Sequence, residues 1–145
     1  MKKVFIGIGI TVVVLVALLG AASSFMLKFA LSPLNEGKNL ESSWEYMFKN
    51  YPELETWKDS LQQANALKDT FIYAPDQARL HAYYVAAPTP TSKTAVIVHG
   101  YTDNAIRMMM IGYLYNKNLG YNILLPDLRY SGLSDGDAFQ MGWLD

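Results

Sequence analysis

The sequence predicts an α/β fold in which an antiparallel hairpin is followed by a parallel β-α-β unit, preceded by a transmembrane helix and a short helical pair. Three observations support this prediction. Residues 4–27 are apolar and uncharged, and residues 79–85 alternate in polarity as a half-buried strand does. Two apolar runs flank a helical pattern between residues 95 and 125, and a strand, a helix and a strand within about 30 residues form a β-α-β unit.

The N-terminal apolar segment is long enough to cross a membrane. As a helix, its 24 residues would span roughly 36 Å at about 1.5 Å per residue, against a hydrocarbon core of about 30 Å. Lys2 and Lys3 precede the segment and only Lys28 follows it, so the positive-inside rule places the N-terminus in the cytoplasm and the remainder outside. We expect a single-pass cell-membrane protein that contacts the membrane through residues 4–27, with residues 1–28 as its anchor.

A cleaved signal peptide is the alternative to a retained anchor, and it would make the protein secreted. Gly20, Ala21 and Ala22 are small residues of the kind that a signal peptidase requires. The apolar run is longer than the usual signal core of about 7–15 residues, which favours the anchor. A buried core helix fits poorly because the segment has no polar face at any helical phase.

Composition excludes several classes of function. The chain has no cysteine, so disulfides, thiolate metal sites and a cysteine nucleophile are ruled out. Beyond Leu27 there are 10 Lys and Arg against 13 Asp and Glu, and their scattered distribution argues against nucleic acid as a partner. His81 and His99 have no carboxylates at metal-binding spacing around them, so we expect neither a metal nor a cofactor.

Residues 29–68 are predicted to form a helical connector that starts with the polar stretch 32–39. Ser42 and Glu45 form a capping box for a first helix, and Pro52 ends that helix and suits the first turn of a second. The two apolar stripes are Leu40, Trp44, Met47 and Tyr51, and Leu54, Trp57, Leu61 and Ala64. Because the polar face is acidic as well as basic, we expect the pair to pack on the domain and not on the membrane surface.

A β-hairpin is predicted next, from a strand at Thr70–Tyr73, a turn at 74–77 and a strand at Arg79–Val85. Leu80, Ala82 and Tyr84 share one face of the second strand, and Arg79, His81 and Tyr83 share the other. The second face is the more polar, which predicts that it is exposed to solvent. An ordinary surface histidine is therefore the prediction for His81.

The predicted β-α-β unit begins with a buried strand at 95–98, which ends at His99 and Gly100. Asn104 is an expected N-cap for a helix over residues 106–118, and the second buried strand covers 121–125. A right-handed crossover makes the two strands parallel. Backbone N–H groups at the carboxyl end of a strand and at a helix N-terminus bind ligands and anions in open α/β sheets.

Side chains of the predicted helix are expected to form sheet-facing core rather than a substrate pocket. They are Met108, Met109, Met110, Ile111 and Leu114. Gly120 follows the helix at the position where glycine is favoured beyond a C-terminus.

These parts resemble α/β-hydrolases in kind and in order. The strand that ends at His99-Gly100 is similar to the one that leads into the family's oxyanion loop. Residues 127–134 read Asp-Leu-Arg-Tyr-Ser-Gly-Leu-Ser, similar to the Asp-x-Arg-Gly-His-Gly-x-Ser loop of many members, although Tyr130 and Ser131 replace Gly-His. The resemblance covers residues 70–145 and implies that residues 69–145 are the N-terminal part of an α/β-hydrolase sheet.

The resemblance assigns a role to His99, Gly100 and Tyr101, because an N–H just after His-Gly helps to hold the developing negative charge in the family. It implies that the backbone N–H of Tyr101 belongs to the oxyanion hole of a serine hydrolase acting on an ester, thioester or peptide. The chain ends at residues 141–145, about where the family begins the helix before its nucleophile strand. Nucleophile, acid and general-base histidine are expected beyond residue 145, so the chain alone is expected to be inactive.

Gly132-Leu133-Ser134-Asp135-Gly136 fits the nucleophile pattern G-x-S-x-G, but its surroundings do not fit the chemistry. A nucleophile elbow needs a strand running directly into the serine and a helix directly out of it. Here the preceding strand ends at Leu125, and loop follows the serine. In this family a histidine must come later in the chain than the nucleophile, and none follows Ser134. We therefore expect Ser134 to be a loop or capping serine.

Two alternatives remain at the level of sequence. His99, Asp127 and Ser134 could form a compact triad, since strand ends converge at one edge of the sheet, but the more direct interpretation is that His99 shapes its loop. A non-catalytic, membrane-anchored interaction module or a truncated gene product is the alternative to a hydrolase, because an open sheet leaves an edge that recruits partners.

Overall fold

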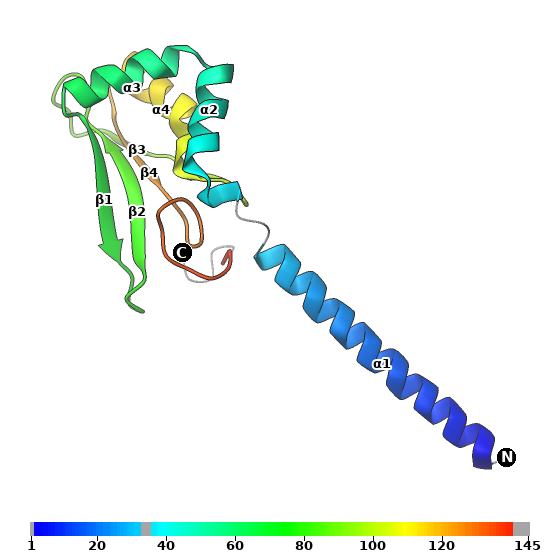
Figure 1. Ribbon diagram of the computed structural model, residues 1–145. Helices are drawn as coiled ribbons and strands as arrows, with labels where there is room; N and C mark the ends of the chain where they lie inside the picture. The colour runs from blue at the N-terminus through cyan, green and yellow to red at the C-terminus, as the bar shows by residue number, and fades with distance from the viewer. Residues whose placement is uncertain (1, 33–35, 141–145) are drawn as a thin grey trace. The chain divides into compact units, whose positions relative to one another are not determined.

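The computed structural model describes residues 2–32 and 36–140, and divides the chain into two compact units, Met1–Pro33 and Leu34–Asp145 (Figure 1). The predicted start of a further helix at 141–145 lies outside the described residues.

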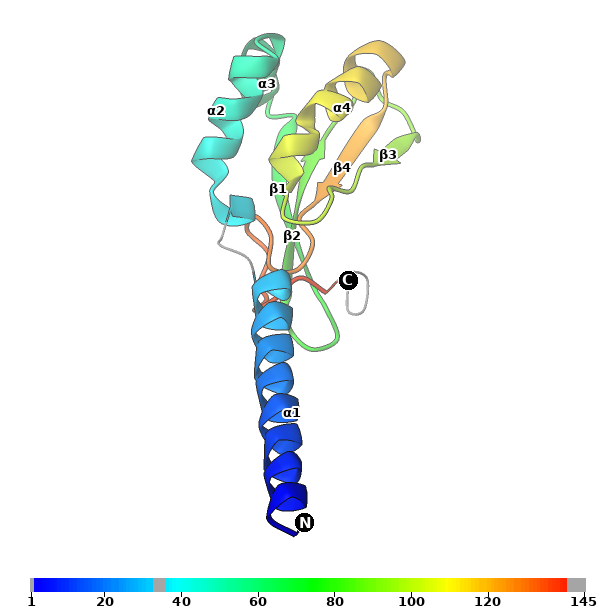
Figure 2. The ribbon, with the colours of Figure 1, turned by 90° about the vertical axis from the view of Figure 1, so that its right-hand side faces the viewer.

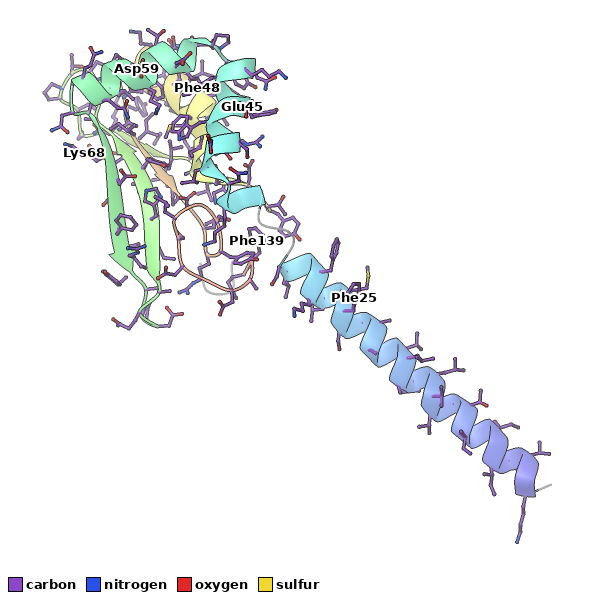
Figure 3. All side chains as sticks on the ribbon, viewed as in Figure 1. Phe25, Glu45, Phe48, Asp59, Lys68 and Phe139 are labelled. Carbon is purple, nitrogen blue, oxygen red and sulfur yellow. The ribbon has the colours of Figure 1, made fainter. Side chains whose placement is uncertain are left out.

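The first unit is the single helix α1, Lys2–Leu31. Its stretch Val4–Leu31 is long and apolar enough to cross a membrane, and none of it is buried. Side chains such as Phe25 project from it on all sides (Figure 3). The hydroxyls of Thr11 and Ser24 donate to carbonyls one turn earlier, so neither polar side chain needs water. The predicted long apolar helix is confirmed, while membrane crossing, cleavage and orientation stay predictions.

The second unit is built on a four-stranded mixed sheet. Its strands are β1 (Leu67–Tyr73), β2 (Arg79–Val85), β3 (Thr94–Val96) and β4 (Asn122–Pro126). They lie in the order β1-β2-β4-β3, with β1 and β4 antiparallel to β2, and β3 parallel to β4. The antiparallel hairpin followed by a parallel β-α-β unit is therefore confirmed.

The predicted helical pair forms α2 (Leu40–Asn50) and α3 (Glu53–Gln63). The prediction of a capping box at Ser42 is wrong, because the helix begins earlier, at an N-cap residue Asn39. The Asn39 side chain accepts from the backbone N–H of Ser42 at 3.0 Å, and the Ser42 hydroxyl turns back to the Asn39 carbonyl. Asparagine is as favourable an N-cap residue as serine, and Asn39, one turn before Ser42, takes this role.

Helices α2, α3 and α4 pack on one face of the sheet (Figures 1 and 2). This confirms that the helical pair packs on the domain, although Ala64 is exposed and does not join the stripe. The buried cluster is Met47, Leu54, Trp57, Leu61, Tyr83, Val85, Ala105, Ile106, Met109, Ile123 and Leu125.

The helix predicted over 106–118 is a composite. A 3-10 turn η2 (Ala105–Met108) leads into α4 (Met109–Tyr113), and a π-turn η3 (Leu114–Asn118) follows. The expected cap is present, because the Asn104 side chain accepts from the N–H groups of Ile106 and Arg107. Gly120 ends the segment with φ +66°, a conformation that glycine adopts without strain. Met109 is buried as predicted, but Leu114 is 46% exposed and faces solvent.

The opposite face of the sheet is not covered by the described helices, which corrects the prediction of a buried strand at 95–98. Ile72, Val96 and Val98 are 65%, 60% and 51% exposed. A short apolar run of this kind is typical of a buried parallel strand. In this chain β3 is an edge strand with β4 as its neighbour, and only the face carrying Ile97 contacts the core.

Candidate functional site

Two loops meet at the carboxyl ends of the parallel strands. The His99 loop (residues 97–104) follows β3, and the Asp127 loop (residues 127–136) follows β4. The N–H of Leu128 donates to Nε2 of His99 at 3.0 Å, and the N–H of Ala105 donates to Oδ1 of Asp127 at 2.8 Å. Each loop is therefore bonded to the other.

His99 is buried and both of its ring nitrogens contact the backbone. Nε2 accepts from Leu128, so the ring proton lies on Nδ1, which donates to the Gly100 carbonyl at 2.8 Å. In this tautomer neither ring nitrogen is available to accept a proton from a serine hydroxyl. The compact triad of His99, Asp127 and Ser134 is therefore not assembled, and the geometry fits a histidine that shapes its loop.

The Gly100–Tyr101 peptide is oriented by two donors on its carbonyl. The Gly100 oxygen accepts from His99 Nδ1 and, at 3.3 Å, from the N–H of Asp103. In a trans peptide the N–H points opposite to the carbonyl, so these bonds also set the direction of the Tyr101 N–H. Thr102 completes the turn with φ +64°. Tyr101 is 49% exposed, and its ring contacts Phe139, with ring centroids 5.1 Å apart.

His81 is buried, which makes the prediction of a surface histidine wrong. Its Nδ1 lies 2.7 Å from Oδ2 of Asp127, and its Nε2 lies 3.0 Å from Oδ1 of Asp69. Strand β2 lies between β1 and β4, and the face that carries His81 and Tyr83 is the one the helices cover. Alternation correctly separated the two faces of the strand, but polarity was a poor guide to which face is covered.

Contacts with the two carboxylates change how His81 titrates. Burial alone would lower the pKa of His81, but hydrogen bonds to Asp127 and Asp69 outweigh burial, so its pKa is raised above the ordinary 6.5. Burial alone would raise the pKa of Asp127, yet hydrogen bonds from His81 and from the N–H groups of Ala105 and Leu133 bring its pKa below the ordinary 3.8. The pair is therefore an imidazolium facing a carboxylate at mildly acidic pH.

Asp127 connects β2, the His99 loop and its own loop through one carboxylate. Besides His81 and Ala105, it accepts from the N–H of Leu133 at 3.1 Å. Gly132 has φ +47°, and a Cβ atom there would lie 2.0 Å from an Asp127 oxygen. Only glycine fits at this position, and this steric requirement explains the glycine of the Asp-x-Arg loop in physical terms.

Ser134 is a buried bracing residue in the Asp127 loop. Its hydroxyl donates to the Asp127 carbonyl at 2.6 Å and accepts from the His81 N–H at 2.8 Å. It does not stand between a strand and a helix, because loop residues flank it on both sides. This geometry agrees with the expectation of a loop serine.

Arg129 was missed as a structural residue by sequence reasoning. It is 5% exposed, and its Nη2 lies 2.8 Å from Oδ1 of Asp76 in the hairpin turn. Hydrogen bonding from Arg129 lowers the pKa of Asp76. An arginine three residues after the end of β4 could have been paired with an acidic turn, but only tertiary structure brings the two segments together.

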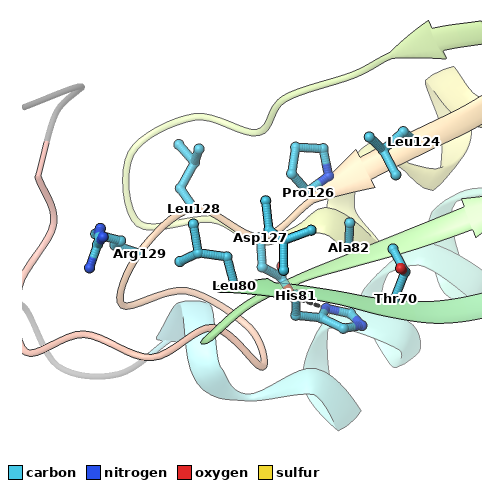
Figure 4. A pocket seen from close by; sticks show the side chains of 10 residues that line it. Thr70, Leu80, His81, Ala82, Leu124, Pro126, Asp127, Leu128 and Arg129 are labelled. Atoms are coloured by element: carbon cyan, nitrogen blue, oxygen red, sulfur yellow. Dashed lines mark hydrogen bonds and ion pairs between the residues drawn. The ribbon is translucent and has the colours of Figure 1, made fainter. Parts of the chain in front are cut away.

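Two hollows flank the loops. One, of about 270 Å³, opens on the uncovered sheet face and is lined mainly by apolar side chains such as Leu80, Pro126 and Leu128 (Figure 4). The other, of about 180 Å³, is polar and is lined by Ser43, Tyr101, Thr102, Asp103 and Arg107. Among the described residues, no group of three or more His, Cys, Asp or Glu side chains could hold a metal ion.

No protein-family model matches the chain. It is 27% identical over 147 residues to the uncharacterized protein YqkD of Bacillus subtilis (strain 168), covering 100% of this chain and 44% of that protein. The chain thus spans less than half the length of this curated relative.

Solved structures with local similarity include hydrolases. The esterase Pf2001 of Pyrococcus furiosus is 29% identical over 52% of this chain and 30% of its own, with a TM-score of 0.45. An alpha-beta hydrolase from Vibrio vulnificus is 25% identical over 61% of this chain and 29% of its own, with a TM-score of 0.48.

Proposed function

We propose that the chain forms the N-terminal part of the catalytic domain of a membrane-anchored, serine-type α/β-hydrolase. In this proposal the domain lies outside the cytoplasm, and the reaction is acyl transfer to water from an ester, thioester or peptide. Nucleophile, acid and general base are supplied by residues beyond 145. Residues 4–27 hold the protein in the membrane.

One observation carries the proposal: a strand, a sharply turned His-Gly loop and a capped helix follow one another at the carboxyl end of β3. In α/β-hydrolases the loop between the third strand and the first helix supplies one N–H of the oxyanion hole. The bonds at the Gly100 carbonyl give the Tyr101 N–H a fixed direction. A donor fixed before the reaction stabilises a developing oxyanion more than a mobile one does.

The reading frame beyond residue 145 provides the first test. The proposal expects a strand leading into G-x-S-x-G, followed later by an Asp or Glu and then a His. An authentic stop directly after Asp145 would contradict the hydrolase and support the non-catalytic interaction module instead.

The second test addresses Tyr101 in a gene product that carries the nucleophile. Tyr101→Pro removes the N–H and should cost roughly 100- to 1,000-fold in kcat, whereas Tyr101→Phe keeps it and should cost little. A thermal melt checks that both variants are folded. Equal losses in the two variants would point to the ring hydroxyl and contradict an oxyanion role for the backbone.

The third test addresses location. Protease added outside intact cells should digest the residues after Lys28, because the Lys2 and Lys3 charges favour a cytoplasmic N-terminus. Full protection of that portion would contradict the proposed orientation, and release of the domain into the medium would indicate a cleaved signal.

A further inference from the structure

The residues that lead into α2 and begin it contact both loops of the candidate site. We call residues 36–43 the strap; it comprises the short 3-10 turn η1 (Glu36–Lys38), the cap residue Asn39 and the first turn of α2. In sequence the strap lies 61 to 96 residues before the residues it contacts in the two loops. Three separate groups of contacts join it to them.

The first contact is the carbonyl of Gly37, which bridges the loops. It accepts from the N–H of Gly132 at 2.8 Å and from Nδ2 of Asn104 at 3.1 Å. One donor belongs to the Asp127 loop and the other ends the His99 loop. Gly37 and Asn104 are both buried, so each bond replaces one to water that is lost on folding.

The second contact is charge-assisted. The ammonium group of Lys38 donates to the carbonyl of Ser134 at 2.7 Å, and it lies 5.8 Å from the centre of the Tyr130 ring. Hydrogen bonds from charged donors are stronger than neutral ones. Lys38 therefore holds the strap against the Asp127 loop.

The third contact fixes the end of the His99 loop. Nδ2 of Asn104 also donates to the hydroxyl of Ser43 at 2.8 Å, while its Oδ1 caps the following helix. The strap also packs closely here, since a Cβ atom on Gly37 would lie 2.9 Å from the Asp103 carbonyl oxygen and 3.2 Å from that of Thr102. The backbone of the strap is thus in direct contact with the turn that sets Tyr101.

We propose that the strap is a positioning element for the His99 loop. Through the strap, the start of α2 is bonded to the loop whose backbone would form the oxyanion hole. The link to an oxyanion hole rests on the proposed hydrolase. Without the strap, the His99–Leu128 and Asp127–Ala105 bonds still join the two loops to each other. They would then no longer be held against α2, and the turn at Thr102 and Asp103, whose Asp103 N–H helps to orient the Gly100–Tyr101 peptide, would lose the backbone that packs against it.

Amide hydrogen exchange on the whole 145-residue chain in detergent micelles tests the proposal. The variants are Gly37→Ala, which inserts a methyl group against the Asp103 carbonyl, and Lys38→Met, which keeps the aliphatic stem and removes the donor. Lys49→Met, at an exposed lysine of α2, is the matched control. We expect roughly three- to tenfold faster exchange in residues 97–104 and 127–136 for both strap variants, with β1 and β2 unchanged and the control like wild type.

The variant Lys38→Arg tests whether the hydrogen bond from residue 38, and not only the volume of its side chain, holds the Asp127 loop. A guanidinium can still donate to the Ser134 carbonyl, so this variant should recover most of the protection that Lys38→Met loses. Unchanged exchange in both loops for both strap variants would overturn the proposal. Faster exchange spread equally over β1 and β2 would also overturn it, because the strap would then contribute only general stability. An arginine variant as loose as the methionine variant would overturn the role given to the Lys38 bond.

These outcomes are independent of catalysis. Exchange rates report where the loops are held, whether or not a nucleophile follows residue 145. A stop codon after Asp145 would contradict the proposed hydrolase but would not change the measured effect of the strap on the loops. Unchanged exchange in the strap variants would contradict the positioning role of the strap but would not test the hydrolase.

Discussion

The imidazole Nδ1 of His81 lies 2.7 Å from Oδ2 of Asp127, inside the domain and between the hairpin and the loop that follows β4. The two residues are 1% and 2% exposed. Both residues are shielded from water, and the pair connects β2 to the Asp127 loop through this buried contact.

Asp127→Asn should destabilise the domain by about 3–5 kcal/mol, because it breaks a buried charged pair and leaves His81 with only the more exposed Asp69 as a charged partner. The asparagine amide would also face donors from His81, Ala105 or Leu133. Urea denaturation followed by tryptophan fluorescence measures the change, since Trp44 and Trp57 pack in the core. Asp59→Asn, at an exposed position of α3, is the control and should change stability by less than about 0.5 kcal/mol. A loss no larger than that of the control would refute a stabilising role for the pair.

The contribution of His81 to stability should fall as pH rises above the ordinary histidine pKa of 6.5. The pKa of His81 is raised in the folded state, so its contribution is fully present below the ordinary pKa of 6.5 and is lost as pH rises through the folded pKa. Between those two values the slope from this one group is at most about 1.4 kcal/mol per pH unit. The lowered pKa of Asp127 has its effect at acidic pH. The contribution of Asp127 to stability is present above its ordinary pKa of 3.8 and is lost as pH falls through its pKa in the folded state.

Comparison with His81→Gln isolates this effect from His99 and from other groups. The unfolding free energy of wild type and variant is measured from pH 5 to 9, a range of about four units that brackets the ordinary histidine pKa. The difference between them should be largest at the acidic end and shrink as pH rises. A difference that stays constant with pH would show that His81 is not charged in the fold.

Ser131 and Ser134 should respond in opposite directions when changed to alanine. Ser134→Ala leaves the His81 N–H and the Asp127 carbonyl without a bond, and should cost about 1–3 kcal/mol. The Ser131 hydroxyl is buried and has no hydrogen-bond partner in the described part of the chain. Ser131→Ala should therefore be neutral or stabilise the domain by up to about 1–3 kcal/mol. Thermal melts of the two variants side by side provide the measurement, and equal losses would contradict this assignment.

The 145-residue chain should not react with a fluorophosphonate, despite its G-x-S-x-G. An activated serine needs a base within hydrogen-bond reach and a group that orients this base. The Ser134 hydroxyl is instead hydrogen-bonded to two backbone groups, and both ring nitrogens of His99 contact the backbone. Labelling should not exceed that of a heat-denatured control. Stoichiometric labelling abolished by Ser134→Ala would establish an active serine here.

Much of the fold could be predicted because its signals are local. Alternation in residues 79–85, the Asn104 cap and Gly120 each act within a few residues, and the structure has them where the sequence places them. Burial could not be predicted in the same way. His81 and Val96 were assigned to the wrong environment, since a strand pattern separates two faces but does not say which neighbours cover them.

The candidate site was less predictable than the fold. The strap depends on Gly37 and Lys38, which carry no motif and meet their partners only after the chain has folded back across the sheet. Arg129 lay inside a recognised motif, yet its partner Asp76 comes from a turn with an unrelated pattern. Contacts between distant segments are set by tertiary structure, which a single sequence without a family pattern does not display.

The bonds at Gly37 have a mechanical consequence. Tension applied along the backbone from α1 reaches Glu36–Lys38 before it reaches any strand of the sheet, because these residues come first in the chain. The hydrogen bonds from Gly132 and Asn104 to the Gly37 carbonyl would therefore be stretched first. Pulling on the helix would loosen the two loops while the ladder between β1 and β2 still holds. A force probe attached at the N-terminus would thus register the loops as an early, small unfolding event before rupture of the sheet.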